Sequence, residues 1–488
     1  MDSFTMPARE LAQRIHSGEI GVVEAVQAAI DKAEANRLNA YITIDKEGAL
    51  MRAEAVQKDI EGGRVASPLA GVPMAIKDNI LQKGRMTSCA SRMLGDEENP
   101  FIAPYDATVV EKLEAAGAIV LGHTNMDEFA MGSTSEYSYY GPVQNPWGEN
   151  RIPGGSSGGS AALVADRAIP YALGTDTGGS IRQPAAFCGI TGLKPTYGAV
   201  SRYGVVAHAS SLDQVGPLAQ TAADCRAILE ILCGKDEMDG TSMALRMGAD
   251  VPSFEGKRIG IPVNYLAGGI DGEVKAAVER AAKTMVDAGA ELVELEMKTV
   301  DYAIPAYYIV SAAEASSNLS RYDGIKYGYR PKEYEDLYDL YLSARTEGFG
   351  EEVKRRIMLG SFVLSSGYYD AYYKKAMQVR ALIKKEFDAA LTRCDAILSP
   401  VTPSTAPVVE GREADPLKIR MMDIYTVSIN LCGLPALSLP CGHDEGGLPI
   451  GMQLIGRAFH DGEILALGEA YQNSTDYHKR MPRKGEVA

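Results

Sequence analysis

Two glycine-rich loops, each carrying a serine, are the part of the sequence whose residue types and spacing best fit chemistry. They occupy residues 154–159 (GGSSGG) and 175–180 (TDTGGS), which places Ser156 and Ser180 24 residues apart. Glycines beside a serine nucleophile allow backbone N–H groups to converge on a developing oxyanion, because no Cβ atom stands in the way. Either loop alone would also suit a tight turn or a phosphate cradle, although neither has the lysine of a P-loop. The pair therefore indicates acyl transfer, with nucleotide binding as the alternative.

A serine nucleophile needs a general base, and the sequence offers a lysine rather than a histidine. None of the six histidines lies in a G-x-S-x-G or H-E-x-x-H motif, so we expect them to be surface or packing residues. Lysine is another known base for a serine nucleophile. Alternation along the strand expected within 69–80 puts Val72, Met74 and Ile76 on one face and Lys77 on the other, at the strand's end. We therefore predict that Lys77 lies inside an apolar shell as the base, the alternative being a solvated lysine.

Burial would give Lys77 the neutral form that a base requires. A free lysine, with a pKa of about 10.4, is neutral in only about one molecule in 2,500 at pH 7. Making the neutral and charged forms equally populated at pH 7 takes about 4.6 kcal/mol, and an environment that disfavours the ammonium form can supply all or part of this energy. The sequence thus predicts a lysine with a lowered pKa.

A layered α/β fold would have to position these residues. Apolar residues recur at helical spacing over 7–38, which predicts two helices, and 39–45 alternates like a strand. A helix followed by a buried strand is expected over 108–122, and the same order recurs over 272–297. Strands that alternate with helices favour a largely buried sheet. Residues 154–204 hold 11 glycines in 51 positions, which indicates tight loops threaded between core elements.

We expect four regions to make up one domain that spans residues 1–488. These are an N-terminal helical segment (1–60), a Gly/Ser-rich catalytic core (61–220), a tyrosine-rich helical segment on the substrate side (300–390) and the C-terminal part of the core (391–488). Residues 302–373 hold 13 of the 25 tyrosines. These tyrosines could form a binding rim, but packing on amphipathic helices is the simpler interpretation.

The charge balance of the chain disfavours one class of partner. The 49 Lys and Arg residues face 64 Asp and Glu residues, a net charge of -15, whereas nucleic-acid binding depends on basic residues that neutralise phosphates. Direct tRNA or DNA binding by this chain is therefore not expected. The seven cysteines include no C-x-x-C pair, and no stretch of about 18 residues is apolar enough to cross a bilayer. Because the N-terminus also lacks a leader pattern, we expect a reduced, soluble, cytoplasmic protein with no membrane partner.

Longer stretches of the sequence resemble the amidase-signature family. The matching text includes AGVPMAIKDNI, NPWGENRIPGGSSGGSAA, GTDTGGSIRQPAAFCGITGLKPTYG and NLCGLPALSLPCG, and the resemblance extends over nearly the whole chain. The segments DEFAMGS, SSNLSRYDG and SSGYYDAYYKKA are similar to the branch of that family that serves tRNA-dependent amidotransferases. The resemblance implies an α/β amidase-signature fold, in which a mixed β-sheet core is covered by helices on both faces (α/β/α).

The family's Ser–cis-Ser–Lys triad maps onto three residues of this sequence. By this resemblance Ser180 attacks a carboxamide carbon, and Ser156, held in a cis peptide bond, passes the proton to neutral Lys77. The resemblance also implies an oxyanion hole made of the backbone N–H groups of Thr177, Gly178 and Gly179.

Substrate recognition is implied at three further positions. Arg356 would bind the α-carboxylate of glutamine with two parallel hydrogen bonds, Asp423 would pair with its α-ammonium group, and Tyr307 would line the pocket. An ordinary salt bridge or a packed tyrosine is the alternative at these positions. His123 and His208 stand where the resemblance leads us to expect Lys and Phe, and neither belongs to the triad.

The resemblance implies a glutaminase that hydrolyses glutamine to glutamate and ammonia. Its expected partners are subunits B and C of an amidotransferase complex, in which the ammonia and ATP are used by a partner to amidate Glu-tRNA(Gln) or Asp-tRNA(Asn). The tRNA would be contacted only through the partner. No metal or cofactor is expected on this chain, since ATP and Mg would bind to the partner. Two other interpretations stay open: a stand-alone amidase with the same triad, and a nucleotide-binding module that uses the glycine-rich loops.

Overall fold

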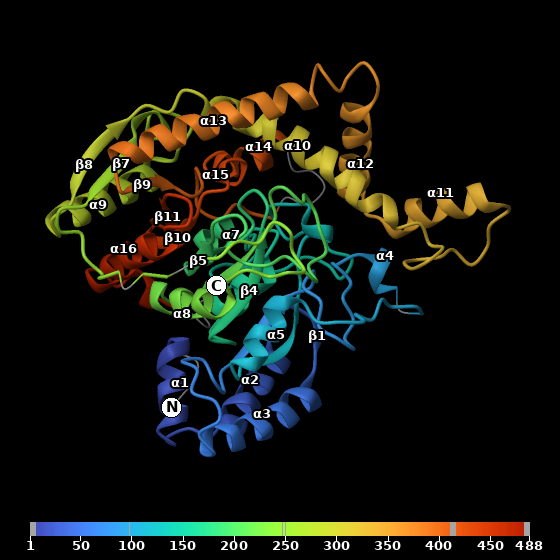
Figure 1. The fold of residues 1–488 in the computed structure, drawn as a ribbon, viewed down its shortest axis with the longest axis horizontal. Coiled ribbons are helices and arrows are strands. Elements are labelled where there is room, and N and C mark those ends of the chain that lie inside the picture. Colours follow the sequence, from blue (N-terminus) through green and yellow to red (C-terminus); the bar gives the residue numbers. More distant parts are fainter. Residues whose placement is uncertain (1–5, 97, 246, 249, 410–415, 483–488) are drawn as a thin grey trace.

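A mixed β-sheet forms the centre of the protein (Figure 1). The computed structural model describes residues 6–96, 98–245, 247–248, 250–409 and 416–482. The strands are β1 (Tyr41–Ile44), β2 (Pro73–Lys77), β3 (Ile119–Thr124), β4 (Tyr171–Asp176), β5 (Thr191–Lys194), β6 (Gln214–Ala219), β7 (Arg258–Pro262), β8 (Glu291–Leu295), β9 (Ala396–Pro400), β10 (Ala436–His443) and β11 (Pro449–Ile455). Within the described residues these 11 strands form one sheet in the order β1-β3-β2-β4-β6-β5-β10-β11-β9-β7-β8.

Helices are distributed along the whole chain between these strands. They are α1 (Ala8–His16), α2 (Val22–Ala35), α3 (Lys46–Glu61), α4 (Arg92–Gly95), α5 (Thr108–Ala115), α6 (Gly158–Ala165), α7 (Arg182–Cys188), α8 (Ala222–Leu232), α9 (Gly272–Asp287), α10 (Ala303–Asn318), α11 (Leu337–Gly348), α12 (Glu351–Leu364), α13 (Tyr373–Arg393), α14 (Pro416–Met421), α15 (Val427–Cys432) and α16 (Asp461–Asn473). In Figure 1, α1, α2 and α3 lie at the bottom of the view, and α10, α12 and α13 lie along its top.

Local sequence explains where several helices begin and end. The Thr221 side chain accepts a hydrogen bond from the Asp224 N–H at 3.0 Å and so caps the start of α8. Such a cap satisfies an N–H group that has no acceptor inside the helix. Helices α7 and α15 end at Gly189 and Gly433, whose φ angles of 67° and 68° lie in the left-handed region. Glycine adopts this conformation without a Cβ clash, which makes it a common helix terminator.

The strands β2, β3 and β4 run parallel to one another, with β2 in the middle. Met74 of β2 pairs with Val120 of β3 and with Tyr171 of β4. Since the carboxyl ends of neighbouring parallel strands meet at one edge, Lys77 and Asp176, the last residues of β2 and β4, come to the same edge of the sheet. In α/β proteins that edge usually carries the ligand site.

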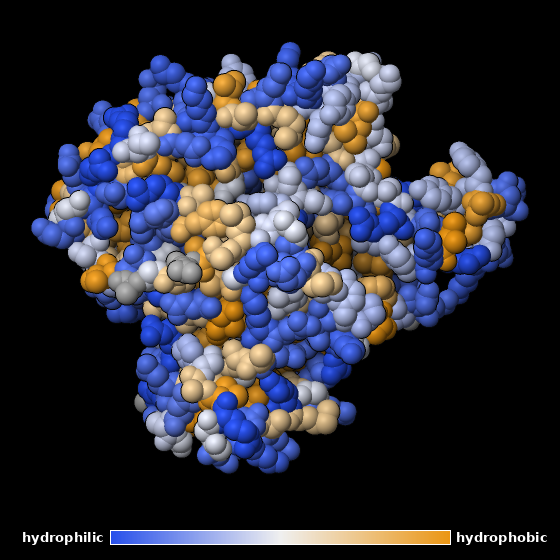
Figure 2. All heavy atoms as spheres, viewed as in Figure 1, coloured by the Kyte–Doolittle hydropathy of each residue, from blue (hydrophilic) through white to orange (hydrophobic). Residues whose placement is uncertain are grey.

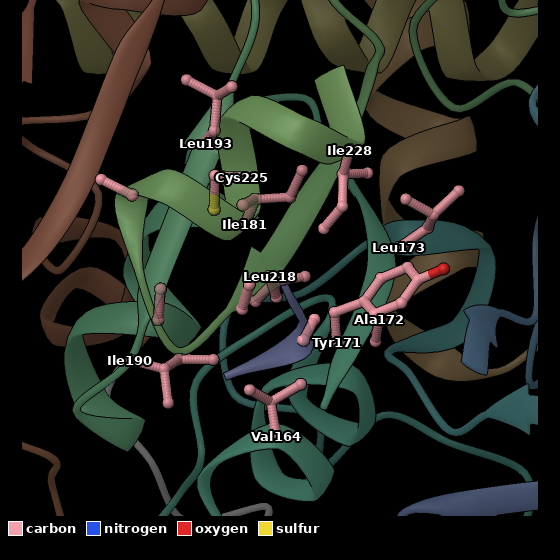
Figure 3. Close-up of a cluster of buried hydrophobic side chains, with 14 of the residues drawn as sticks. Val164, Tyr171, Ala172, Leu173, Ile181, Ile190, Leu193, Leu218, Cys225 and Ile228 are labelled. Carbon is pink, nitrogen blue, oxygen red and sulfur yellow. The ribbon is translucent and has the colours of Figure 1, made fainter. Parts of the chain in front are cut away.

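Helices cover both faces of the central strands. Every residue of β2, β3, β4, β6 and β11 is buried, so neither face of these strands is open to water. Figure 3 shows Val164 of α6 and Ile228 of α8 among the apolar side chains that pack against β4 and β6. Burial on both faces explains why these strands consist mostly of apolar residues and do not alternate between apolar and polar residues.

The sequence predictions about the fold are largely confirmed. Helices α1 and α2 occupy the predicted region 7–38, and β1 falls inside 39–45. Both predicted helix-then-strand units are present, as α5 with β3 and as α9 with β8. The mixed sheet and its helices confirm the α/β class. The division of a single domain into four regions stays a prediction.

A helical arm, which we define as residues 323–349 and which contains α11, projects from the body of the protein (Figure 1). Apolar and aromatic side chains of the arm are exposed, and Figure 2 shows hydrophobic atoms gathered on this projection. They are Ile325, Tyr327, Tyr334, Leu337, Tyr338, Tyr341 and Leu342. Across the tyrosine-rich segment only four tyrosines of the described chain are buried, namely Tyr307, Tyr308, Tyr322 and Tyr329. Tyr327, Tyr368, Tyr369, Tyr372 and Tyr373 also pack on neighbouring tyrosine rings. Packing on helices therefore stays a prediction for the cluster as a whole.

Candidate active site

Lys77 lies at the end of β2 in direct contact with Ser156. Its Nζ atom is 2.7 Å from Ser156 Oγ and 2.9 Å from Thr175 Oγ1, and the lysine is completely buried. The contacts come from β2, β4 and the loop before α6. Lys77 is thus buried as predicted, but the prediction of an apolar shell is wrong, because hydroxyl groups surround the amine.

Burial lowers the pKa of Lys77 to about 7, in agreement with the sequence prediction. The carboxylates of Asp127, Asp176 and Asp213 favour the charged amine and oppose this effect. Burial also raises the pKa values of Asp127 and Asp213 to about 6. An amine with a pKa near 7 is largely neutral just above neutral pH, whereas a free lysine is not. Neutral Nζ could accept a proton from Ser156 across the 2.7 Å contact.

The backbone around Ser156 is fixed by several contacts. The peptide bond between Gly155 and Ser156 is cis, as the resemblance predicts. The Gly155 N–H donates to Gln183 Oε1 at 2.8 Å, and the Ser156 carbonyl accepts from the Asp127 N–H at 3.3 Å. A Cβ atom at Gly155 would overlap the Asp127 carboxylate, so the loop can take this position only with glycine there.

Ser180 is the most accessible residue of the predicted triad. It is 7% exposed, whereas Lys77 and Ser156 are fully buried. The Ser180 hydroxyl makes no hydrogen bond within the described part of the chain. Its carbonyl accepts from the Ser157 N–H at 3.2 Å, which joins the two serine loops. A substrate entering from solvent would therefore reach the Ser180 hydroxyl before the other two side chains.

The three N–H groups predicted for the oxyanion hole are not equivalent. The Gly179 N–H donates to Asp176 Oδ1 at 2.8 Å. The N–H groups of Thr177 and Gly178 have no acceptor among the residues that the structure describes. An oxyanion could bind to these two groups directly but would compete with the carboxylate for the third. A Cβ atom at Gly178 would lie 2.5 Å from Cζ of Tyr307, so glycine lets the loop approach that ring.

A buried ion pair fixes the turn that carries Ser180. Arg182 Nε donates to Asp176 Oδ2 at 3.0 Å, and neither side chain is exposed. Arg182 also donates to Asn430 Oδ1 at 2.6 Å. Burial raises the pKa of Asp176, but the charge and hydrogen bonds of Arg182 outweigh this and hold the pKa at about 2. The carboxylate that orients the turn is therefore ionised at neutral pH.

The structure brings the three predicted substrate residues to the same part of the site. Tyr307 packs on Gly178, and the charges of Arg356 and Asp423 both act on its hydroxyl. Arg356 Nε donates to Glu352 Oε1 at 2.7 Å, but its two Nη atoms make no hydrogen bond within the described residues. These two atoms are free to hold a carboxylate. The substrate roles of these residues stay predictions.

Asp423 is a buried carboxyl group whose ionised form is disfavoured. Burial raises its pKa to about 7, although the hydrogen bond from Ser133 Oγ (2.6 Å to Oδ2) and the charge of Arg356 act the other way. A ligand ammonium group beside Asp423 would favour the carboxylate and lower this pKa. The position therefore suits the amine of an amino acid.

Two cavities adjoin this part of the site. One of about 510 Å³ is lined by Glu128, Tyr137, Phe349 and Glu352, and so reaches the partner of Arg356. The other, of about 310 Å³, is lined among others by Thr134 and Met422, the sequence neighbours of Ser133 and Asp423. Both volumes are typical of small-molecule sites.

Sequence reasoning missed several residues that shape the site. Thr175, which contacts Lys77, opens the second glycine-rich loop, so its position in that motif could have drawn attention to it. Ser133 is the last residue of the quoted segment DEFAMGS, but nothing in the sequence assigned Ser133, Asp213 or Glu352 to the site. Ser133 acts on a partner far away in the sequence, Asp423, 290 residues on, whereas Glu352 acts on Arg356 in the next turn of the same helix.

Metal clusters and membrane-spanning helices are both absent from the described ranges. No group of three or more His, Cys, Asp or Glu side chains there is placed to hold a metal ion. Within the same ranges, no helix has the length and apolar character needed to cross a membrane. All seven cysteines are free thiols.

Comparison with known proteins assigns the chain to a family. The Amidase family model matches residues 24–465. The A subunit of the glutamyl-tRNA(Gln) amidotransferase of Lachnospira eligens is 54% identical over 480 residues, which are 97% of this chain and 99% of that protein. The crystal structure of the corresponding A subunit from Thermotoga maritima has a TM-score of 0.81 and 38% identity, and the match covers 98% of this chain and 97% of that chain.

A more distant structure shows how widely the fold is shared. A bacterial aryl acylamidase of the amidase-signature family has a TM-score of 0.85 at 24% identity, and the match covers 99% of both chains. At that identity the likeness concerns the fold alone. Because the family model and the closer relatives both extend over nearly the full length, this chain belongs to the amidase-signature family, in the group of glutamyl-tRNA(Gln) amidotransferase A subunits.

Proposed function

We propose that this chain is the glutaminase subunit of a tRNA-dependent amidotransferase. The observation that carries the proposal is the 2.7 Å contact between Lys77 Nζ and Ser156 Oγ, at a lysine whose pKa burial lowers to about 7. Through Ser156, this contact supplies a base for the hydroxyl of Ser180, the most accessible residue of the triad. Identity of 54% to a glutamyl-tRNA(Gln) amidotransferase A chain, over nearly both full lengths, supports glutamine as the amide.

In the first half of the reaction, Ser180 Oγ attacks the carboxamide carbon of glutamine. Its proton passes to Ser156 Oγ, whose own proton passes to neutral Lys77 Nζ. The negative charge that develops on the carboxamide oxygen is stabilised by the free N–H groups of Thr177 and Gly178. When the C–N bond breaks, the proton returns along the same hydroxyls to the leaving nitrogen, which departs as ammonia.

In the second half, water replaces ammonia and the ester is hydrolysed. The water oxygen attacks the carbonyl carbon of the glutamyl ester on Ser180 while its proton passes through Ser156 to Lys77. The C–O bond to Ser180 then breaks, Ser180 takes back a proton, and glutamate leaves. Each turnover thus consumes one water and restores the starting protonation of all three side chains.

Substrate recognition uses both ends of the amino acid. The two free Nη atoms of Arg356 bind the α-carboxylate, and Asp423 binds the α-ammonium group. Tyr307 stands between this pair and the oxyanion loop, since it packs on Gly178 and the charges of both Arg356 and Asp423 act on it. Recognition at both ends would favour free glutamine over amides that lack either charge.

The ammonia is used by a partner. Subunits B and C complete the complex, and one of them activates tRNA-bound glutamate, or tRNA-bound aspartate, with ATP and Mg. The net charge of -15 supports leaving tRNA contact to that partner. Exposed leucine and tyrosine side chains on the arm, such as Leu337 and Tyr338, support an interface there, because monomeric proteins rarely keep such patches.

Replacement of the nucleophile tests the proposed function. In the full chain, Ser180→Ala should lower ammonia release from glutamine by about 10³-fold or more while leaving the circular dichroism spectrum and thermal midpoint unchanged. Ser320→Ala, which changes an exposed serine, is the matched control and should keep full activity. Activity near that of the wild type in Ser180→Ala would remove Ser180 as the nucleophile.

A further inference from the structure

Glu128 is a buried carboxyl group that binds the start of α12. It opens the short 3-10 helix η1 (Glu128–Ala130) and is 6% exposed. Its two carboxyl oxygens lie 2.9 and 3.1 Å from the N–H of Gly350, which donates to them, and the Ser91 hydroxyl donates to one of them. Gly350 is the residue that precedes the first turn of α12. The carboxyl group thus lies at the positive end of the helix dipole, and burial raises its pKa to about 7 although the hydrogen bonds from Ser91 and Gly350 act the other way.

Helix α12 carries the residue proposed to read the α-carboxylate of glutamine. The helix begins with the Lys354 N–H donating to the Gly350 carbonyl at 3.1 Å. Glu352, in the first turn, holds Arg356 through a 2.7 Å contact between Oε1 and Nε. The placement of the Arg356 guanidinium therefore depends on where the first turn of α12 is anchored.

The segment around Glu128 also contacts the catalytic loops. The Asp127 N–H donates to the Ser156 carbonyl at 3.3 Å, and Ser133, five residues after Glu128, donates to Asp423. The segment 127–133 thus contacts the serine loop, Asp423 at the candidate ammonium site and Gly350 at the start of α12. Its geometry links the reacting end of the site to its recognition end.

The backbone after Glu128 is in an unfavourable conformation that its surroundings hold in place. Phe129 and Ala130 have φ angles of 48° and 60°, in the left-handed region that residues other than glycine seldom adopt. Phe129 packs on Phe349 and Tyr322, with ring centroids 5.6 and 5.2 Å away. Strain of this kind persists where neighbouring contacts over-determine the geometry, and it is commonly found at functional sites.

We infer that Glu128 is a positioning residue for glutamine recognition, which anchors the N-terminus of α12 and thereby sets Arg356 at the correct distance from Ser180. The inference rests on the proposed glutaminase function. Its consequence is specific: loss of the Glu128 contact weakens recognition of the α-carboxylate and leaves the chemistry at the amide intact. In this role Glu128 acts through α12 and Arg356.

A pair of substrates separates this positioning role from a general structural one. Glu128→Gln in the full chain should raise KM for glutamine about tenfold with kcat nearly unchanged, because one of the two oxygens that accept from the Gly350 N–H is replaced by an NH2 group. Hydrolysis of 4-aminobutyramide, which keeps the carboxamide and the ammonium group but has no carboxylate, should not change. Glu351→Gln, at the exposed neighbouring position on α12, is the matched control and should behave as wild type.

A double variant tests whether Glu128 acts through Arg356. Arg356→Ala should raise KM for glutamine by at least the same factor, and Glu128→Gln should add nothing in the Arg356→Ala background. Should Glu128→Gln not fold, Ser91→Ala removes one hydrogen bond to the same carboxyl group and should shift KM in the same direction by a smaller factor. Equal losses with glutamine and 4-aminobutyramide, or additive effects in the double variant, would overturn the inference.

Glutamine binding without turnover keeps the two hypotheses apart. Calorimetric titration of glutamine into full-length Ser180→Ala should give a dissociation constant about tenfold lower than for Ser180→Ala with Glu128→Gln. A wild type that binds glutamine but does not hydrolyse it would contradict the proposed function and leave this comparison valid. Equal dissociation constants, or no binding in either variant, would overturn the role of Glu128.

Discussion

Lys77 illustrates how the environment of one side chain sets its chemistry. Burial lowers its pKa, and three nearby carboxylates raise it, yet the value stays near 7 because desolvation has the larger effect. Alternation along the strand correctly predicted that the lysine is buried. It could not predict the hydroxyl partners, because Ser156 and Thr175 lie 79 and 98 residues further along the chain.

The rate should depend on the protonation of Lys77. Since burial lowers the pKa to about 7, the amine is neutral above that pH and charged below it. We expect kcat for glutamine to fall about tenfold per pH unit on the acid side of about pH 7 and to be level above it. Steady-state kinetics between about pH 5 and about pH 9 measure this profile. Lys77→Arg should be inactive throughout, because a guanidinium stays protonated, and full activity in that variant would contradict the base role.

His208 is a buried residue whose polar atoms are not satisfied. The ring is 2% exposed, and neither ring nitrogen has a partner with good hydrogen-bond geometry in the described part of the chain, although the Ala130 backbone contacts the ring and favours its charged form. Burial and then the charges of Arg356 and Lys77 lower the pKa of His208 well below its usual value. The ring is thus neutral in the folded protein and takes up a proton on unfolding in acid.

His208→Phe should stabilise the protein. Removing two unpaired nitrogens should raise the free energy of unfolding by about 1–3 kcal/mol. Because the unfolded chain binds the extra proton below about pH 6.5, the wild type loses stability as the pH falls through that value, and the variant should lose less. Urea denaturation near neutral pH and in mild acid measures both effects. A less stable variant would show that the nitrogens have partners that stabilise them.

The junction between β4 and α7 shows how elements place the nucleophile. Asp176 ends β4, Arg182 begins α7, and Ser180 lies in the turn that their ion pair closes. The glycine-rich motif predicted a turn with a nucleophile in it. The motif did not show that the Gly179 N–H is already engaged by Asp176, because that depends on the three-dimensional course of the turn.

Asp176→Asn should destabilise this junction and impair catalysis. Arg182 would keep a buried charge without its ionised partner, a change that costs about 3–5 kcal/mol of folding free energy when such a pair is broken. Urea denaturation measures the loss, and the kcat for glutamine should fall with little change in KM. Asp31→Asn, at an exposed position on α2, is the matched control. Unchanged stability of Asp176→Asn would mean that the pair does not hold the turn.

The sequence predicted which segments form helices and strands better than it predicted where those segments lie in the fold. The periodicity of 7–38 and the helix-then-strand units was enough to predict α1, α2, α5 and α9 with their strands. Periodicity does not determine which strands become neighbours, so the pairing of β5 with β10 could not be foreseen. For the same reason the meeting of Tyr307, Arg356 and Asp423 rested on the resemblance alone.

At the scale of the whole molecule, the arm is the feature that best fits assembly with other subunits. Leu337 and Tyr338 on α11 are 69% and 77% exposed, and no part of the described chain covers them. Composition does not show which helices leave the body of the protein. The arm carries exposed apolar side chains, which fits the proposed assembly.

Polar replacements on the arm should weaken assembly. Leu337→Ser combined with Tyr338→Ser should lower the affinity for the partner subunits by about tenfold or more, as measured by titration of the purified subunits. The thermal midpoint of the chain alone should not fall, since both side chains are exposed. Met51→Ser, at a 67% exposed position on α3, is the matched control and should not affect assembly. Unchanged affinity in the double variant would place the interface elsewhere.

The uncovered arm also has a consequence for how cells must make this protein. Under the proposed assembly, a copy produced in excess of its partner subunits keeps exposed leucine and tyrosine side chains on the arm in water. Surplus copies should then aggregate or be degraded, whereas copies made in equal amounts with the partner subunits should persist. The exposed arm is therefore a second reason, besides the stoichiometry of the reaction, to make this chain and its partner subunits in equal amounts.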